Sequence, residues 1–233
     1  MERSSLVMTR KLLAESFGTF ALVFAGTGAI TIDEISGGIV SHVGIALTFG
    51  LVVLATIYAI GDVSGAHINP AVTLGFWFAG RLAGRSVIPY ILSQCLGALL
   101  ASGLLRISFV NHPTLGVCRP SGPSSQAFLL EAVLTCFLMF VILNVSSGSK
   151  EKGLTAGIAV GAVITLGALF AGPISGACMN PARSLSPALV TGQLSSLWIY
   201  LSAPVLGTLL AVGACQCVQG QGCCNSTTTE KRQ

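Results

Sequence analysis

Two stretches of the chain place a turn, an asparagine and a proline in the same order. The first reads Ser-Gly-Ala-His-Ile-Asn-Pro-Ala over residues 64–71, and the second reads Ser-Gly-Ala-Cys-Met-Asn-Pro-Ala over residues 175–182. Asparagine is a favoured N-cap and proline a favoured first helical residue, so each Asn-Pro pair predicts the start of a helix. Such an asparagine can cap its helix through the amide carbonyl and still donate N–H groups to a small polar molecule. The candidate site residues are Asn69, Pro70, Ala71, Asn180, Pro181 and Ala182.

Arg183 follows the second motif directly, whereas Val72 follows the first. An arginine at membrane depth costs at least about 2.5–3.5 kcal/mol, so such a residue usually faces a cavity and has a function. The short distance from Pro181 argues against a side chain that reaches the membrane surface. We therefore expect Arg183 to line the same site as the two asparagines.

The composition places these motifs in a bilayer. Of the 233 residues, 52% are hydrophobic and 9% are charged, against about 25% charged in ordinary soluble domains. The net charge of +4 comes from sparse Lys and Arg residues near the ends of apolar segments, which gives no reason to expect a nucleic-acid partner. No nucleophile–base set and no metal-ligand spacing is visible, so neither an enzyme nor a metal or cofactor site is predicted. Cys95, Cys136 and Cys178 lie in apolar segments and are expected to act as small hydrophobic residues.

The apolar segments predict six membrane-spanning helices. Each is close to the roughly 20 residues that a span needs, and they cover about 11–32, 40–60, 87–108, 127–147, 154–172 and 195–215. Two shorter apolar helices follow the Asn-Pro pairs, over about 69–79 and 180–190, and are too short to span. We expect them to be re-entrant half-helices buried within the protein.

The two halves of the sequence repeat. Glu15-x-x-x-Thr19 opens the first span and Glu131-x-x-x-Thr135 opens the fourth, while residues 94–101 of the third span match residues 204–211 of the sixth. Three spans per half is an odd number, so the second half enters the membrane upside down. The predicted fold is an all-α membrane protein with six transmembrane helices and two re-entrant half-helices in an inverted repeat, covering about 10–108 and 127–215. The N-termini of the half-helices would then meet near the midplane.

Charge asymmetry predicts the orientation. With six spans both termini lie on one side, and the Lys and Arg residues on that side are Arg3, Arg10, Lys11, Arg81, Arg85, Lys150, Lys152, Lys231 and Arg232. Only Arg106 and Arg119 fall on the other side, so the positive-inside rule places both termini in the cytoplasm. We expect residues 1–215 to form one channel domain and residues 216–233 to form a disordered cytoplasmic tail.

Two Asn-Pro-Ala boxes at equivalent points of a six-span repeat, with an arginine after the second, resemble the aquaporin (major intrinsic protein) family. The resemblance covers about residues 10–215. It implies an aquaporin-like bundle in which each protomer of a homotetramer has its own pore. It also implies that the carboxylates of Glu15 and Glu131 bond the backbone of the re-entrant loops, although a proton relay is the alternative for such intramembrane acids. His67 resembles the pore-facing loop histidine of the family, and a purely structural histidine is equally consistent with the sequence.

In this family a narrow constriction surrounds the arginine of the second motif. Counting from the motifs, the resemblance places this selectivity filter at His42, Ala168, Ala177 and Arg183. Strict water channels of the family carry Phe, His and a small residue beside the arginine. Here His42 would replace the Phe and Ala168 the His, so the ring is expected to be wider. Residues 179–188 are similar to the nodulin-26-like branch of the family. A histidine at position 42 is instead similar to vacuolar-type and ammonia-permeable members. The sequence is also consistent with an unusual bacterial-type aquaporin.

The predicted function is a passive transmembrane channel for water and small uncharged solutes that excludes protons and ions. Two half-helix N-termini, each with roughly half a positive charge, would repel cations at the point where they meet. The alternative within transport is a facilitator for metalloid acids, ammonia or glycerol with incidental water flow. A proton-coupled carrier using Glu15 or Glu131, and a junctional membrane protein, are hypotheses from other classes. The expected location is the plasma or cell membrane, with the lipid bilayer and the permeating solutes as partners.

Overall fold

A computed structural model describes residues 2–146 and 150–223, and over these residues the protein is helical. The helices are α1 (Glu2–Ser36), α2 (Ser41–Ser64), α3 (Pro70–Phe78), α4 (Gly84–Ser108), α5 (Ser124–Val145), α6 (Lys150–Ser175), α7 (Pro181–Thr191) and α8 (Leu197–Gln219), followed by the 3-10 turn η1 (Gly220–Cys223). Within the described residues, six helices are long and apolar enough to cross a membrane, namely α1, α2, α4, α5, α6 and α8.

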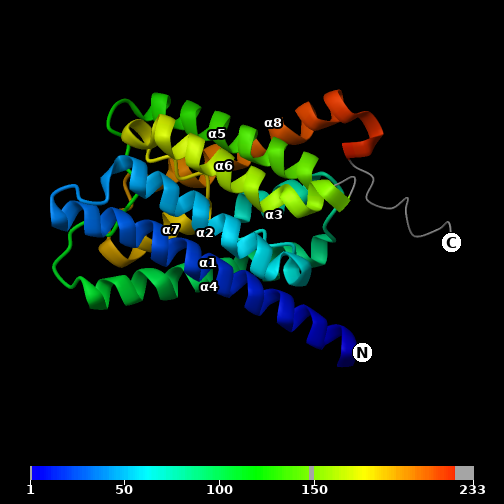
Figure 1. Cartoon of the computed structure of the whole chain (residues 1–233), viewed down its shortest axis with the longest axis horizontal. Helices are drawn as coiled ribbons and strands as arrows, with labels where there is room; N and C mark the ends of the chain where they lie inside the picture. The colour runs from blue at the N-terminus through cyan, green and yellow to red at the C-terminus, as the bar shows by residue number, and fades with distance from the viewer. Residues whose placement is uncertain (1, 147–149, 224–233) are drawn as a thin grey trace.

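The remaining two helices, α3 and α7, are the predicted half-helices. They have 9 and 11 residues, which at 1.5 Å per residue gives about 14 and 17 Å, or roughly half of a 30 Å hydrocarbon core. Asn69 caps the first and Asn180 caps the second, and a proline opens each. Figure 1 shows them in opposite halves of the molecule, among the long helices. The predicted fold of six spans and two half-helices is confirmed.

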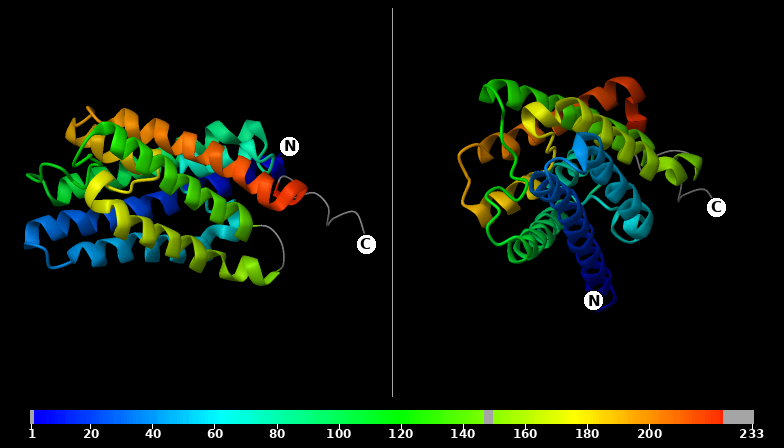
Figure 2. Two further views of the ribbon diagram at one scale, coloured as in Figure 1. Left: turned by 90° about the horizontal axis from the view of Figure 1, so that it is seen from above. Right: turned by 60° about the vertical axis from the view of Figure 1, so that its left-hand side comes forward.

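Glycines allow close contact within two helix pairs that are equivalent in the two halves. Helix α1 packs along α4, and α5 packs along α8 (Figures 1 and 2). A Cβ atom at Gly97 of α4 would meet the carbonyl oxygen of Ser16, and one at Gly207 of α8 would meet the carbonyl oxygen of Ala132. Small residues allow such close approach between helices in a membrane.

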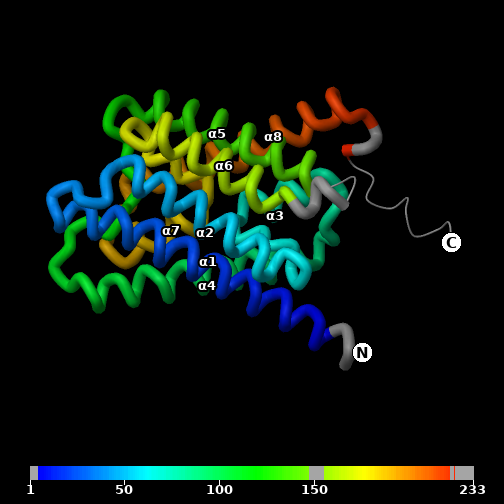
Figure 3. The backbone as a smooth tube through the Cα atoms, viewed as in Figure 1, coloured from blue at the N-terminus to red at the C-terminus, as the bar shows by residue number. Residues whose placement is uncertain are grey.

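The C-terminal boundary corrects the prediction of a disordered tail from residue 216. Helix α8 continues through Gln219, and Cys223 in η1 is buried and disulfide-bonded to Cys215. The guanidinium of Arg81, at the end of the α3 segment, donates to the carbonyl oxygen of Cys223, so this turn has a fixed partner. In Figure 3 the C-terminal part of α8 lies at the same end of the molecule as the N-terminal part of α1. The rest of the expected tail, residues 224–233, lies outside the described residues.

Candidate functional site

The two motif loops share one unusual backbone conformation. Gly65 and Gly176 both have a φ of 91°, a region that glycine tolerates better than any other residue. Two further residues in each loop have φ between 44° and 50°, namely Ala66, Ile68, Ala177 and Met179. Non-glycine residues in this left-handed region cost of order 1–3 kcal/mol each and persist only where the surroundings hold them. The loops therefore need firm anchors.

Glu15 anchors the first loop. Its carboxylate is fully buried and accepts hydrogen bonds from the backbone N–H groups of His67 at 2.9 Å and Ile68 at 2.7 Å, and from the hydroxyl of Ser64 at 2.7 Å. The side-chain amide of Gln94 donates to the same carboxylate at 2.8 Å. Charged hydrogen bonds of this kind are among the strong ones in proteins, so one side chain of α1 fixes the whole loop.

Glu131 anchors the second loop in the same way. The fully buried carboxylate accepts from the backbone N–H groups of Cys178 at 2.9 Å and Met179 at 2.7 Å, and from the hydroxyl of Ser175 at 2.9 Å. Pro204 stands at the position of α8 that corresponds to Gln94 of α4. The two anchors are therefore equivalent except for the extra amide donor in the first half.

Sequence reasoning missed a second pair of anchors, Tyr90 and Tyr200. The hydroxyl of Tyr90 donates to the carbonyl oxygen of Ser64 at 2.9 Å, and that of Tyr200 donates to the carbonyl oxygen of Ser175 at 2.6 Å. Both rings are buried. The available signal was spacing, because each tyrosine lies seven residues before the repeated glycine of its helix, Gly97 or Gly207.

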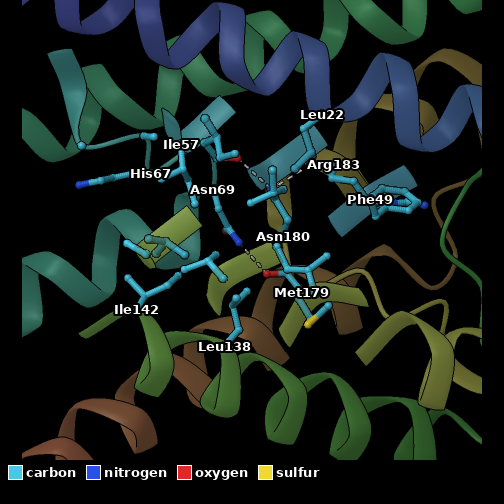
Figure 4. A pocket seen from close by; sticks show the side chains of 18 of the residues that line it. Leu22, Phe49, Ile57, His67, Asn69, Leu138, Ile142, Met179, Asn180 and Arg183 are labelled. Atoms are coloured by element: carbon cyan, nitrogen blue, oxygen red, sulfur yellow. Dashed lines mark hydrogen bonds between the residues drawn. The ribbon is translucent and has the colours of Figure 1, made fainter. Parts of the chain in front are cut away.

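The two asparagines bind each other's loops. The amide oxygen of Asn69 accepts from the N–H of Ala71, and that of Asn180 accepts from the N–H of Ala182 at 3.0 Å, so each caps its own helix. The Asn69 amide nitrogen donates to the carbonyl oxygen of Met179 at 2.8 Å, and the Asn180 amide nitrogen donates to that of Ile68 at 2.9 Å. Figure 4 shows both contacts as dashed lines at the centre of the cavity. An amide has two N–H groups, and within the described residues only one is used, so each asparagine keeps one for a molecule in the cavity.

A narrow cavity of about 100 Å³ runs past these two asparagines. A water molecule needs about 10–15 Å³ of such space, so the cavity has room for several. Its walls are mostly apolar side chains of the long helices, such as Leu22, Val53 and Leu138, together with the two motif loops. A lining of apolar walls with a few polar groups at fixed positions suits a small polar solute.

Arg183 lines the cavity beside the second motif loop. Its side chain is 3% exposed, and its Nη1 atom donates to the carbonyl oxygen of Gly116 at 2.7 Å and to the Cys118 sulfur at 2.9 Å. The guanidinium carbon lies 5.3 Å from the centre of the Phe49 ring, within cation–π range. Ala168 and Ala177 line the same cavity, so three of the four residues expected in the constriction come together.

His42 does not join them, and this corrects the sequence prediction. The residue lies in the first turn of α2, is exposed, and has its Nε2 atom 2.9 Å from the carbonyl oxygen of Leu169. Phe49 lies seven residues further along α2, about 10 Å along the helix axis, and faces Arg183 instead (Figure 4).

Cys178 also departs from its expected role as a small hydrophobic residue. It forms a disulfide with Cys118, sixty residues earlier in the chain. Cys118 belongs to the connector between α4 and α5, which also donates from the Ser121 N–H to the carbonyl oxygen of Ile174 at 2.9 Å. The disulfide therefore fixes this connector to the second motif loop, directly beside Arg183.

His67 combines both expectations drawn from the sequence. It lines the cavity, where Figure 4 shows it beside Asn69, and it also has structural partners. Its Nδ1 atom is 3.2 Å from the hydroxyl oxygen of Thr73, and its ring stacks on Phe76 with 4.5 Å between centroids.

Comparison with known proteins gives a consistent result. A family model described as Major intrinsic protein matches residues 2–214. Aquaporin NIP1-1 of Zea mays is 46% identical over 211 residues, which are 90% of this chain and 75% of the maize protein. Nodulin-26 of Glycine max is 43% identical over 206 residues, 88% of this chain and 76% of the soybean protein. The crystal structure of an aquaglyceroporin from Plasmodium falciparum is similar with a TM-score of 0.79 and 25% identity, covering 90% of this chain and 94% of that one.

Proposed function

Because the chain belongs to the major intrinsic protein family, the aquaporins, we propose that it is a passive channel for water and small uncharged solutes that excludes protons and ions. The family is one of membrane channels rather than enzymes, and the six spans make this an integral multi-pass membrane protein. The observation that supports the proposal most directly is the reciprocal bonding of Asn69 and Asn180 at the cavity. It holds two helix N-termini, each with roughly half a positive charge, against one lumen.

Electrostatics supports the exclusion of cations. The two N-termini and the Arg183 guanidinium all present positive charge to the cavity, while the carboxylates of Glu15 and Glu131 bond the outer side of the loops. A water molecule that accepts from both asparagines has its oxygen fixed toward them, which interrupts a chain of proton-donating waters. The same bonding argues against a proton-coupled carrier, because both carboxylates are occupied as structural acceptors.

The residues around Arg183 favour a channel that also passes solutes larger than water. We propose Phe49, Ala168, Ala177 and Arg183 as its selectivity filter, in which two alanines leave space on the walls. This supports the second candidate function, a facilitator for glycerol, ammonia or metalloid acids with incidental water flow. The similarity to a solved aquaglyceroporin points the same way.

Assembly and orientation are part of the proposal. We propose a homotetramer with one pore per protomer in the plasma or cell membrane, with residues 1–215 as a single channel domain. Many large apolar side chains of the long helices are exposed, including Phe17, Leu51, Leu92 and Phe170, as expected for contact with lipid or neighbouring subunits. Nine Lys and Arg residues of the sequence fall on the same side of the proposed spans as the two termini. The positive-inside rule makes that side the cytoplasmic one.

The test is transport in proteoliposomes. Stopped-flow light scattering should show faster osmotic shrinkage than in protein-free liposomes, and glycerol, urea, ammonia and boric acid should be compared in the same preparation. A voltage-clamped bilayer should show no proton current, and Arg183→Ala should admit cations. Solute uptake that requires a pH gradient would contradict the channel proposal and favour a carrier.

A further inference from the structure

The disulfide between Cys118 and Cys178 lies at the constriction rather than at the periphery of the protein. Both cysteines are buried, and Cys178 is one of the residues that line the cavity. Cys178 follows Ala177 directly, and Cys118 lies two residues after Gly116. The bond therefore joins the wall of the pore to the segment of the connector that contacts Arg183.

Arg183 takes its position from this segment. The Nη1 atom has two acceptors, the Gly116 carbonyl oxygen at 2.7 Å and the Cys118 sulfur at 2.9 Å, and both belong to the connector. A disulfide sulfur is an acceptor only, whereas a thiol also carries a proton and can rotate about its own side chain. The disulfide thus supplies an acceptor of fixed position that a free thiol would not.

The connector has other attachments on both sides of Gly116, the nearest at Thr114, whose hydroxyl donates to the Glu34 carboxylate at 2.9 Å. At its α4 end, Arg106 donates to the carbonyl oxygen of His112 at 2.9 Å, and His112 pairs with Glu34 at 3.1 Å. At its other end the backbone of Ser121 bonds that of Ile174. The disulfide is the covalent attachment between these two points, where the arginine acceptors are located.

We propose that the Cys118–Cys178 disulfide is a specificity-determining element of the pore, which holds Arg183 against the wall so that solutes larger than water can pass. This inference rests on the proposed function. When the disulfide is broken, the guanidinium leaves its acceptors and extends into the cavity, where the neighbouring alanines leave it space. The constriction then narrows, and permeability to larger solutes falls relative to that for water.

The chemical step is a thiol–disulfide exchange with an added dithiol reductant. The reductant supplies two electrons and two protons, the S–S bond of the protein breaks to give two thiols, and the reductant becomes a cyclic disulfide. An oxidised disulfide such as oxidised glutathione reverses the step. The proposal therefore predicts a change in selectivity that is reversible in the full-length protein.

The experiment measures glycerol and water permeability in the same proteoliposomes, before dithiothreitol, after it, and after reoxidation. We expect the glycerol-to-water ratio to fall by about fivefold on reduction, the factor that loss of one net hydrogen bond gives, and to recover on reoxidation. Alkylation followed by mass spectrometry verifies that both thiols were released. The Cys118→Ser and Cys178→Ser variants should have the low ratio already and show no response to the reductant.

The Cys215→Ser variant is the matched control, because it removes the other disulfide of the described residues. It should keep the full response, and loss of the response in this variant would overturn the proposal. So would an unchanged ratio after verified reduction, or a parallel fall of both permeabilities with loss of the folded protein, which a merely structural disulfide would give. If the oxidised protein is no more permeable than empty liposomes, the proposed channel function fails as well, and the two failures are thereby distinguished.

Discussion

Asn69 and Asn180 are each bonded to the loop that begins the other's helix, with donor–acceptor distances of 2.8 and 2.9 Å. Asn69 and its partner Met179 are 110 residues apart in the sequence, yet the two half-helices are held together through side chains that also cap them. Displacement of one loop therefore disturbs the cap and the backbone of the other. The centre of the molecule is a single polar unit rather than two independent motifs.

The first prediction concerns this unit. Asn69→Ala removes an N-cap, which contributes about 1 kcal/mol, and the hydrogen bond to Met179, which contributes a similar amount. We expect a loss of about 2 kcal/mol in the free energy of unfolding, measured by thermal or denaturant unfolding in detergent. Asn111→Ala is the control, because Asn111 is exposed in the connector and should tolerate the change. Equal stability of the two variants would show that the asparagine contacts contribute nothing.

The second prediction separates the structural and proton-relay interpretations of the buried acids. In wild type the Glu131 carboxylate accepts from the Ser175 hydroxyl and from the backbone N–H groups of Cys178 and Met179. In Glu131→Gln one carboxylate oxygen becomes an NH₂ group, which faces these donors and cannot accept from them. We expect destabilisation by about 1–3 kcal/mol and loss of water permeability.

Asp62→Asn makes the same chemical change on an exposed side chain of α2 and should leave both quantities unchanged. If Glu131→Gln instead folds with native stability and alters only the pH dependence of transport, the proton-relay interpretation is correct.

The third prediction tests the corrected constriction. Phe49→Ala removes the ring beside Arg183, which widens the cavity and also removes the cation–π contact. We expect the glycerol-to-water permeability ratio to rise by about tenfold, equivalent to a barrier about 1.4 kcal/mol lower. His42→Ala is the matched control on the same helix and should leave the ratio unchanged, since His42 does not line the cavity. The reverse result would restore His42 to the filter.

The elements of this fold were predictable because local physical rules determine them. Apolar length indicates each span, and the Asn-Pro pairs indicate where α3 and α7 begin. The inverted repeat follows from the Glu15 and Glu131 segments together with an odd number of spans per half. Each of these inferences needs only a short window of sequence or a comparison between two windows.

The remaining features depend on which residues meet in three dimensions. Choosing between His42 and Phe49 requires the position of α2 along its axis, and both residues lie within the same apolar segment. The Cys118–Cys178 pair joins a connector to a re-entrant loop across sixty residues, and no local pattern marks it. Tyr90 and Tyr200 were recoverable in principle from their equal spacing to the repeated glycines, because that spacing is itself part of the repeat.

The fourth prediction uses two glycines of α4 that have opposite surroundings. A Cβ atom at Gly97 would meet the backbone of Ser16 in α1, whereas one at Gly103 would meet nothing within 4 Å. Gly97→Ala must push α1 and α4 apart, an overpacking that costs about 1–3 kcal/mol. Gly103→Ala adds a better helix former in open space and should stabilise the protein by about 0.5–1 kcal/mol. The melting temperatures in detergent should therefore shift in opposite directions, and a shift of the same sign for both would mean that helix propensity, not the contact with α1, decides the outcome at Gly97.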